Sequence, residues 1–378
     1  MAIQGLMKLP IEVENKDAIE ILNVLSKASN KIGRLEEKFK HSIVSEALVQ
    51  ILSLSESVES TRIEGTQVTF SDMIEEKDDK NPRWEIIEVK NYQKALLEGS
   101  ERIRNGYPIS TRLIKELHES LMIGARGSTH ASGEFRKVQN FIGPTNRIED
   151  ATYIPIPADQ IGDYMENLEY FINGHPYGNK LSITHLSHDD RIYYVFAEDS
   201  DPLVKTAILH AQFESIHPFL DGNGRLGRIL IVLHLMQSKL VTKPIFFVSE
   251  ELERERMRYY DLLNGVRGKN PDWGSWILFF LHACNRMADK IIDKLDKAEA
   301  LAEKGLKLCE TPSDRKVWLY TFSNPFVQVS SVSEALNVSP NTARKSLNNL
   351  VEKGLLFTDR HTKRNKKYRN YDLVRILS

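Results

Sequence analysis

The sequence predicts a mainly α protein, built as a helical bundle with one small β-hairpin and followed by a C-terminal winged helix domain. Three observations carry this prediction. Apolar residues recur at helical spacing along most of the chain up to Gly305. One segment between the helices, Gly133–Pro157, is rich in turn, β-branched and aromatic residues. From about Thr311 the chain reads as helix, short helix, helix and a basic hairpin.

The expected elements follow in chain order. Apolar spacing predicts helix from Asp17 to Glu64, and its second part, from Val44, ends before Gly65, a residue that favours helix termination. The segment Leu226–Gln237 is apolar almost all round, as a helix at the centre of a bundle is. Gly133–Pro157 is expected to form a hairpin or an extended loop. The other expected helices are Pro82–Asn105, Thr111–Ile123, Asp159–Asn173, Leu203–Ile216 and Trp273–Lys304, the last ending near Gly305.

Composition limits the class of protein. The chain has 378 residues, enough for two or three domains of about 150 residues. Its 51 Lys and Arg balance 52 Asp and Glu, which excludes a wholly basic nucleic-acid coat and an acidic disordered chain. Two cysteines are too few for a disulfide framework and indicate a reducing, cytoplasmic compartment. The N-terminal residues lack a signal-peptide core and no apolar run approaches about 18 residues, so no membrane partner is expected.

The charge is unevenly distributed. Residues 326–378 contain 10 Lys and Arg against 4 Asp and Glu, and the rest of the chain contains 41 against 48. The net charge of the whole chain is therefore close to zero because an acidic body and a basic C-terminal segment offset each other. Contact with nucleic acid is expected only in that segment.

The most informative segment is HPFLDGNGRLGR at residues 217–228, a loop that leads into a predicted helix. Gly222 and Gly224 allow a tight turn that presents consecutive backbone N–H groups to an anion. The positive end of the following helix dipole adds to this attraction. Arg225 and Arg228 are three residues apart, so both can reach one polyphosphate.

Two further residues of this segment suit phosphate-transfer chemistry. Asp221 offers a hard oxygen ligand for Mg²⁺, which commonly bridges phosphate oxygens. His217 can take a proton near pH 7, as activation of a hydroxyl group requires. A core histidine and a solvated arginine pair would explain either feature alone, but not all of them within one short segment.

This segment resembles the signature of the Fic family, H-P-F-x-[D/E]-G-N-G-R-x-x-R, and every specified position matches. The resemblance covers roughly residues 40 to 300 and implies an all-α core that transfers AMP from ATP to a protein hydroxyl. It implies that His217 deprotonates a Ser, Thr or Tyr hydroxyl and that Asp221 holds Mg²⁺. It also implies that Gly222, Asn223 and Gly224 stabilise the α-phosphate and that Arg225 and Arg228 hold the β- and γ-phosphates. Gly224 favours nucleotidyl transfer over the phosphate transfer of a family branch that lacks this glycine.

The resemblance suggests two further parts of the site. Phe141, Ile142 and Gly143, with Ile154-Pro155, look like the family's flap, which aligns the target backbone by strand addition. Tyr259 and Tyr260 resemble residues that line the adenine pocket. A hairpin packed on a bundle and two core aromatic residues are the alternatives.

Ser60, Glu64 and Gly65 fit the family's inhibitory helix pattern, [S/T]-x-x-x-E-[G/N]. A carboxylate in the last turn of a helix is disfavoured by the helix dipole unless it meets a cation. By the resemblance that cation is Arg228, and the pairing blocks placement of the γ-phosphate. Glu64→Gly is therefore expected to increase AMP transfer, and His217→Ala to abolish it. Glu64 could instead orient a water that removes AMP, and the sequence does not separate the two roles.

The C-terminal segment resembles a winged helix-turn-helix. Val332–Leu336 is expected as a short helix, and a second helix starts at Pro340 with Ser339 as its cap and stops at Gly354. Leu355–Phe357 and Lys367–Tyr371 would bracket a basic tip, Arg360–Lys366. The exposed face of the second helix is expected to present Asn341, Thr342, Arg344, Lys345 and Asn348. A DNA-binding role and a protein-binding role both stay open.

Three predicted domains result: an N-terminal helical region, 1–105, with the inhibitory helix at about 44–65; a Fic core, 106–305; and the winged helix domain, 306–378. The predicted function is protein adenylyltransfer to another protein or to the chain itself. The alternative is a DNA-binding regulator whose core senses nucleotide without transfer. Family relatives imply a homodimer through the core.

Overall fold

The computed structural model describes residues 2–75, 82–125, 131–145, 147–174, 192–359 and 366–377. The α-helices are α1 Asn15–His41, α2 Ser45–Ile63, α3 Phe70–Glu75, α4 Trp84–Arg104, α5 Thr111–Met122, α6 Ile161–Asn173, α7 Pro202–Ile216, α8 Asn223–Gln237, α9 Ser249–Arg254, α10 Arg256–Gly265, α11 Trp273–Leu308, α12 Pro312–Tyr320, α13 Val329–Leu336, α14 Pro340–Glu352 and α15 Tyr371–Leu377. The strands are β1 Ile3–Gln4, β2 Ile11–Glu14, β3 Tyr153–Ile154, β4 Tyr193–Phe196, β5 Phe326–Val327, β6 Phe357–Thr358 and β7 Tyr368–Arg369, and two 3-10 turns span Ile148–Asp150 and Ala158–Gln160. The predicted mainly α class is confirmed.

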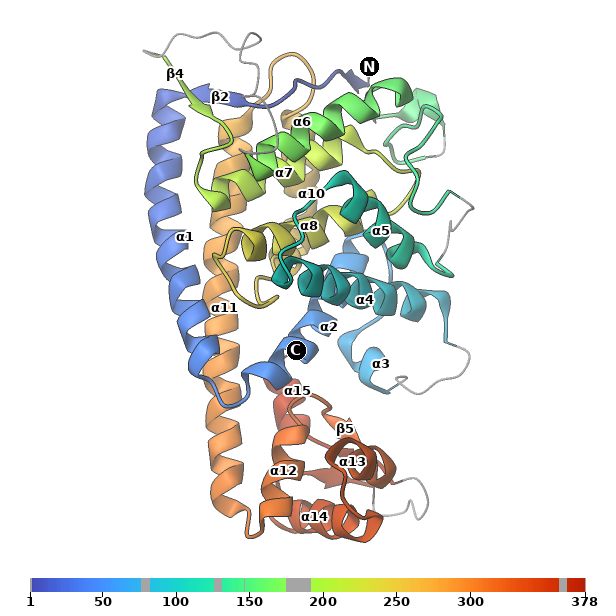
Figure 1. Cartoon of the computed structure of the whole chain (residues 1–378), viewed down its shortest axis with the longest axis vertical. Coiled ribbons are helices and arrows are strands. Elements are labelled where there is room, and N and C mark those ends of the chain that lie inside the picture. Colours follow the sequence, from blue (N-terminus) through green and yellow to red (C-terminus); the bar gives the residue numbers. More distant parts are fainter. Residues whose placement is uncertain are drawn as a thin grey trace.

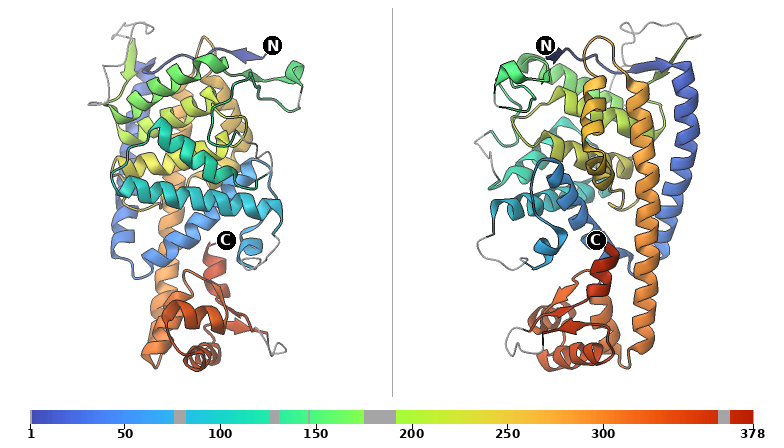
Figure 2. Two further views of the ribbon diagram at one scale, coloured as in Figure 1. Left: turned by 45° about the vertical axis from the view of Figure 1, so that its right-hand side comes forward. Right: turned by 180° about the vertical axis from the view of Figure 1, so that it is seen from behind.

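Helix α11 links the body of the molecule to the C-terminal domain. It runs beside α1 through the body and continues down to the C-terminal domain (Figures 1 and 2). At 36 residues it is about 54 Å long, at 1.5 Å per residue. Because α1 and α11 present their apolar sides to each other, Ile21, Ala28 and Ile32 of α1 are fully buried.

Helix α8 occupies the centre of the body, as its apolar sequence predicts. It packs against α7 and α4, and all its residues from Leu226 to Leu235 are buried. The signature loop between α7 and α8 therefore stands on two central helices. Such a support fixes the position of the functional side chains better than a surface loop would.

Two glycines at expected helix ends behave differently. Gly65 follows α2 with φ +96°, in the left-handed region that ends a helix readily at glycine. Gly305, expected near the end of a helix, lies inside α11, which continues to Leu308. A Cβ at Gly305 would lie 2.2 Å from Cε2 of Trp318, so this glycine makes room for the indole of α12. Packing, not helix termination, accounts for Gly305.

The β-structure of the body is small. The expected hairpin forms as a single antiparallel bridge between Ile142 and Tyr153, in which Ile142 N–H donates to the Tyr153 carbonyl at 2.9 Å. On its other edge, β3 pairs in parallel with β1 near the N-terminus. Strand β2 pairs separately with β4 in an antiparallel register. The N-terminal residues thus cover one edge of the hairpin, a role that the sequence did not reveal.

The C-terminal domain is a winged helix-turn-helix. Helix α14 begins at Pro340, and the Ser339 hydroxyl accepts from Thr342 N–H at 3.1 Å. Asn337 turns the chain between α13 and α14 with φ +49°. Strands β5, β7 and β6 form the wing sheet, with β7 in the middle. Of the expected basic tip, residues 360–365 lie outside the described residues.

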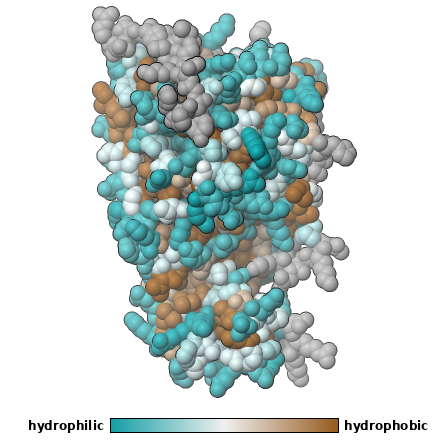
Figure 3. Space-filling model, in the orientation of Figure 1, coloured by the Kyte–Doolittle hydropathy of each residue, from teal (hydrophilic) through white to brown (hydrophobic). Residues whose placement is uncertain are grey.

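On the face shown in Figure 3, the coloured surface of the body and of the C-terminal domain is mostly hydrophilic, with separate hydrophobic patches. In the described part of the chain, no helix has both the length and the apolar character that crossing a bilayer requires.

Candidate active site

His217 ends helix α7 in an unusual conformation. Its φ and ψ are 50° and 60°, the left-handed region that a non-glycine residue rarely adopts. The ring Nδ1 lies 3.3 Å from the Glu214 carbonyl oxygen, so Nδ1–H donates there and Nε2 is left as the basic nitrogen. Burial, reinforced by the positive charges of Arg267 and Arg136, lowers the pKa of His217 to about 4. The imidazole is therefore neutral near pH 7 and able to accept a proton.

The loop after His217 is held by the side chain of Asn223, the first residue of α8. Its Oδ1 accepts from Phe219 N–H and its Nδ2 donates to the Phe219 carbonyl, both at 2.9 Å. Gly222 precedes it with φ +78°. These contacts close the loop on itself and direct the first N–H groups of α8 outwards, as an anion-binding helix N-terminus requires.

Arg228 is the most deeply buried cation of the site, with 1% of its side chain exposed. Its Nε donates to the Ser60 hydroxyl at 2.7 Å and its Nη2 to the Ser60 carbonyl at 3.0 Å. Nη2 also donates to Oε1 of Glu64 at 2.6 Å. The pairing between Glu64 and Arg228 that the resemblance implies is thus present in the structure. Ser60 adds two further contacts from the same helix.

The electrostatics of this pair follow from its position. Burial by itself raises the pKa of Glu64, but the Arg228 guanidinium outweighs burial and holds that pKa below its usual value. Burial likewise disfavours the charged form of Arg228, yet Glu64 raises its pKa. Both groups are therefore ionised near pH 7. Glu64 keeps 36% of its side chain exposed, which places its carboxylate at the mouth of the site.

Glu64 occupies the anion-binding end of α8. A Cβ on Gly224 would lie 2.2 Å from Glu64 Oε1 and 3.1 Å from Arg228 Nη1. The carboxylate therefore lies directly over the first turn of α8, where the backbone N–H groups and the helix dipole attract negative charge.

Arg225 is also buried, with 4% of its side chain exposed, and lies between two carboxylates. Its guanidinium is 3.7 Å from Glu88 Oε2 and 3.5 Å from Asp221 Oδ1. Its Nε and Nη1 have no hydrogen-bond partner among the described residues. Buried donors without acceptors are costly, so this guanidinium suits a further anionic ligand.

Asp221 is half exposed at the end of the loop, two residues before α8. Over the described residues, no three His, Cys, Asp or Glu side chains come together as a metal-binding group. A single accessible carboxylate beside a phosphate-binding helix fits Mg²⁺, which is usually bound by one or two carboxylates with phosphate oxygens and water. It does not fit a metal that needs a cage of protein ligands.

Two residues that sequence reasoning missed support the loop. His118 of α5 accepts from Gly133 N–H through Nδ1 at 2.9 Å and lies 3.0 Å from the Asp221 carbonyl through Nε2. Its ring is stacked on Phe219 with 3.8 Å between centroids. Burial lowers the pKa of His118, which keeps the ring neutral, with Nε2–H as the donor.

Arg136 is the second of these residues and is 2% exposed. Its Nε donates to the His217 carbonyl at 2.9 Å, its Nη2 to the Ile156 carbonyl at 2.5 Å and its Nη1 to the Val138 carbonyl at 3.1 Å. One guanidinium thus joins the loop to both sides of the hairpin. In the sequence, His118 lies on an ordinary amphipathic helix and Arg136 in a turn-rich segment. No local pattern distinguishes them, because their partners are distant in the chain.

The hairpin residues Phe141, Ile142 and Gly143 lie beside the loop. The preceding Asn140 donates through Nδ2 to the Phe219 carbonyl at 3.4 Å. Phe141 and Ile142 are half-buried and Gly143 is exposed. Because β1 covers the edge of β3, the opposite edge, along Phe141–Gly143, is the one that another strand could join.

The two tyrosines of α10 differ in exposure. Tyr259 is 1% exposed and its hydroxyl lies 2.9 Å from His210 Nε2. Tyr260 is half-buried and donates to the Ile63 carbonyl at 3.4 Å. Tyr259 therefore belongs to the core in this structure, and Tyr260 contacts the helix that carries Glu64. Their role in binding adenine stays a prediction.

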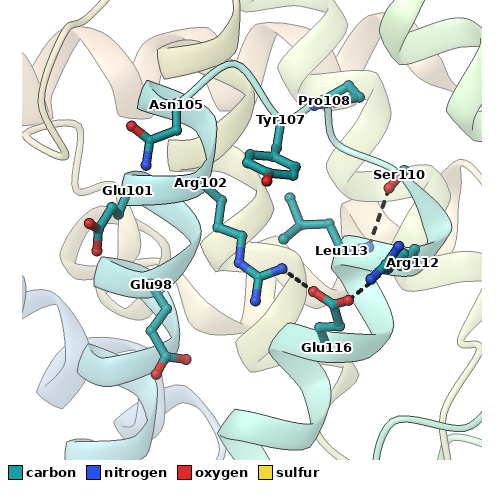
Figure 4. A pocket seen from close by; sticks show the side chains of 10 residues that line it. All are labelled: Glu98, Glu101, Arg102, Asn105, Tyr107, Pro108, Ser110, Arg112, Leu113 and Glu116. Atoms are coloured by element: carbon teal, nitrogen blue, oxygen red, sulfur yellow. Dashed lines mark hydrogen bonds and ion pairs between the residues drawn. The ribbon is translucent and has the colours of Figure 1, made fainter.

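A cavity of about 670 Å³ lies elsewhere, between α4 and α5 (Figure 4). Arg102 and Arg112 both pair with Glu116 on its wall. None of the predicted site residues lines it. The converging groups around α8, and not this cavity, form the candidate active site.

Comparison with known families divides the chain into three parts. Residues 108–235 match the Fic/DOC family and residues 22–101 match the Fic/DOC family N-terminal domain. Residues 323–361 match the DeoR-like helix-turn-helix domain. The first two matches include the signature segment and the helix that carries Glu64, and the third covers α13 and α14.

Curated relatives are distant. A probable protein adenylyltransferase of Aquifex aeolicus is 24% identical over 242 residues, which are 62% of this chain and 64% of that protein. The protein adenylyltransferase Fic of Drosophila virilis is 22% identical over 255 residues, 66% of this chain and 42% of that protein. The chain thus spans less than two thirds of the length of either relative.

Solved structures share the fold. A Fic family protein from Desulfovibrio desulfuricans G20 aligns with a TM-score of 0.53 and 21% identity, over 93% of this chain and 95% of that one. A Fic domain containing signaling protein from Bacteroides thetaiotaomicron aligns with a TM-score of 0.51 and 18% identity, over 71% of this chain and 97% of that one. The alignment with the first extends over nearly the whole chain.

Proposed function

Because this chain belongs to the Fic/DOC family, we propose that it is a protein adenylyltransferase that moves AMP from ATP to a hydroxyl group of a protein. One observation carries the proposal. The neutral His217 imidazole stands at one end of a loop whose other end is an anion-binding helix N-terminus with Arg228 beside it. A base beside a polyphosphate site is the arrangement that nucleotidyl transfer requires.

In the proposed reaction, Nε2 of His217 takes the proton of a Ser, Thr or Tyr hydroxyl. The hydroxyl oxygen then bonds to the α-phosphorus of ATP, and the bond from that phosphorus to the oxygen bridging the α- and β-phosphates breaks. Pyrophosphate leaves and the proton stays on His217 until solvent removes it. Because burial lowers the pKa of His217 to about 4, the imidazole is neutral near pH 7 and Nε2 is free to accept that proton.

The remaining signature residues would bind the triphosphate. The N–H groups from Gly222 to Gly224 and the Asn223 side chain suit the charge that develops on the α-phosphate. Arg225 and Arg228 suit the outer phosphates, which is consistent with the lack of a hydrogen-bond acceptor for Nε and Nη1 of Arg225 in the described part of the chain. Asp221 would hold Mg²⁺, which when bound neutralises phosphate charge.

The protein substrate would align along Phe141–Gly143. A strand added at this edge would run beside the loop that carries His217, because Arg136 ties the two together. Backbone pairing gives little sequence selectivity, so one edge could accept another protein or a segment of this same chain. The adenine base would then contact Tyr260, with Tyr259 behind it.

We further propose that Glu64 inhibits the reaction. Its carboxylate over Gly224 and its pairing with Arg228 support this role, because the γ-phosphate and the carboxylate cannot share that volume. Removal of AMP by a water that Glu64 orients is the alternative use of the same position.

Incubation with ATP labelled on the α-phosphate tests the proposal. Glu64→Gly should label itself or added protein, and Glu64→Gly with His217→Ala should not. ATP labelled on the γ-phosphate is the control and should transfer nothing. If the Glu64→Gly protein binds nucleotide but no protein becomes labelled, the proposal of adenylyl transfer is overturned.

A second candidate function is DNA binding through the C-terminal domain. It is favoured by the exposure of Asn341, Arg344 and Lys345 on α14, which lies at the end of the molecule away from the body (Figure 1). If this second function is correct, the core senses nucleotide without transferring AMP, and α14 contacts base edges in the major groove of DNA. Label transfer that depends on His217 separates the two candidates.

A further inference from the structure

A second buried carboxylate lies on the inner side of α2, eight residues before Glu64. The side chain of Glu56 is 3% exposed, and both of its oxygens accept hydrogen bonds. Oε1 accepts from the Ser249 hydroxyl and from the Tyr92 hydroxyl, the latter at 3.1 Å. Oε2 accepts from Ser249 N–H at 3.2 Å. Glu56 thus ties α2 to α9 and to α4.

These contacts continue to the active site. Ser60 follows Glu56 by one helical turn, and its hydroxyl accepts from Arg228 Nε at 2.7 Å. Glu56, Ser60 and Glu64 are spaced four residues apart, so they lie along one side of α2. That side carries a line of polar side chains, from Glu56 at α9 through Ser60 to Glu64 at Arg228.

A buried polar line of this kind specifies one position of the helix. Sliding or rotating α2 would leave Glu56, Tyr92 and Ser249 without partners, and an unpaired buried polar group is costly. An apolar face, by contrast, tolerates small displacements. Burying the ionised carboxylate costs free energy, and burial accordingly raises the pKa of Glu56 to about 7.

The same segment of chain meets α2 a second time. Ser249 begins α9, and α10 follows with Tyr260, whose hydroxyl donates to the Ile63 carbonyl. One stretch from α9 to α10 therefore contacts α2 near its middle at Glu56 and at its end next to Glu64. This stretch also carries the predicted adenine contacts.

We propose that Glu56 is a positioning residue that holds α2 at the depth where Glu64 reaches Arg228, so that the contact with Ser249 maintains the inhibited state. This inference rests on the proposed function, since it assigns a control element to that same site. Loss of the Glu56 contact frees the last turn of α2, and Glu64 then leaves Gly224 for part of the time. Movement of α9 and α10 when nucleotide binds has the same effect.

The experiment compares AMP transfer from α-labelled ATP in the full chain. Glu56→Ala should raise the rate about tenfold, equivalent to about 1.4 kcal/mol. Glu56→Gln keeps one acceptor oxygen, so its transfer rate should lie between those of the wild type and Glu56→Ala. Ser249→Ala removes the hydroxyl partner and should also raise the rate, and it tests the same contact if Glu56→Ala folds poorly.

Glu59→Ala is the matched control. Glu59 lies on the same helix, and its carboxylate pairs with Arg62 three residues on. Its removal should leave the transfer rate within about twofold, because the i, i+3 helix pair that the half-buried Glu59 makes with Arg62 contributes only about 0.2–0.5 kcal/mol. The double variant Glu56→Ala, Glu64→Gly should be as active as Glu64→Gly alone, because the inhibiting carboxylate is already absent.

Hydrogen exchange supplies a readout that does not need activity. Glu56→Ala should speed exchange of the amides from Ile63 to Thr66 relative to wild type. Unchanged exchange there, together with an unchanged transfer rate, would overturn the positioning role, as would a double variant less active than Glu64→Gly. If Glu64→Gly itself transfers nothing while exchange responds as expected, the proposed function fails and the positioning role stands.

Discussion

The Glu64 carboxylate lies against the Cα of Gly224, so closely that a methyl group at Gly224 would come within 2.2 Å of Glu64 Oε1. Residue 224 is therefore restricted by residue 64, which is distant in the chain. This contact joins the N-terminal helical region to the first turn of α8. It also makes the state of Glu64 measurable through stability, independently of catalysis.

Gly224→Ala should destabilise the wild-type protein by about 1–3 kcal/mol, because the added methyl group overpacks the Glu64 carboxylate. In the Glu64→Gly background the same substitution should cost less than about 1 kcal/mol, because the remaining close contact, Arg228 Nη1 at 3.1 Å, is the end of a long side chain that can shift. Urea denaturation of the four proteins measures the difference. Equal effects in both backgrounds would show that Glu64 does not rest on Gly224 in solution.

The rate of AMP transfer by the Glu64→Gly protein should change little between pH 8 and pH 6. A base must be neutral to act, and burial lowers the pKa of His217 to about 4, so its neutral fraction is nearly complete at pH 6. Loss of the Glu64 charge, which raises that pKa, moves it further down. The kcat/KM for ATP should therefore stay level as pH falls from 8 to 6. An acid limb near pH 6.5 would contradict the burial of this imidazole.

Arg136→Ala should destabilise the protein by about 2–4 kcal/mol, because three carbonyl oxygens lose a charged donor. It should also lower kcat, since one of those carbonyls belongs to His217. Arg112→Ala is the control: that side chain is 88% exposed and pairs with Glu116 on the surface, so its loss should cost under about 0.5 kcal/mol. A wild-type kcat in a stably folded Arg136→Ala protein would remove Arg136 from the positioning of His217.

Arg344→Ala and Lys345→Ala should each weaken binding of the C-terminal domain to duplex DNA and reduce the salt dependence of binding by about one unit of slope. Their melting temperatures should not change, because both side chains are exposed. Arg375→Ala, an exposed arginine of α15, should leave affinity unchanged. If the intact chain binds no duplex at low salt, the domain binds protein or serves only in packing.

Local pattern was enough for most of the elements. The positions of α5, α7 and α14 follow from apolar spacing, caps and prolines, which act within a few residues of the chain. The signature from His217 to Arg228 could also be recognised from the sequence, because all its groups lie on one loop and one helix turn. The pairing of Glu64 with Arg228 required a resemblance, because the two residues are distant in the chain, and the structure contains that pairing.

The sequence by itself determined the helical class, the winged C-terminal domain and the loop that can bind phosphate. The tertiary structure decided which distant groups support that loop: His118 and Arg136 from outside it, and Glu56 behind the inhibiting helix. It also decided that Gly305 admits Trp318 and does not end a helix. The reason is the range of the forces involved. Helix and turn preferences act between neighbours in the chain, whereas burial and hydrogen-bond satisfaction depend on partners that only folding brings together.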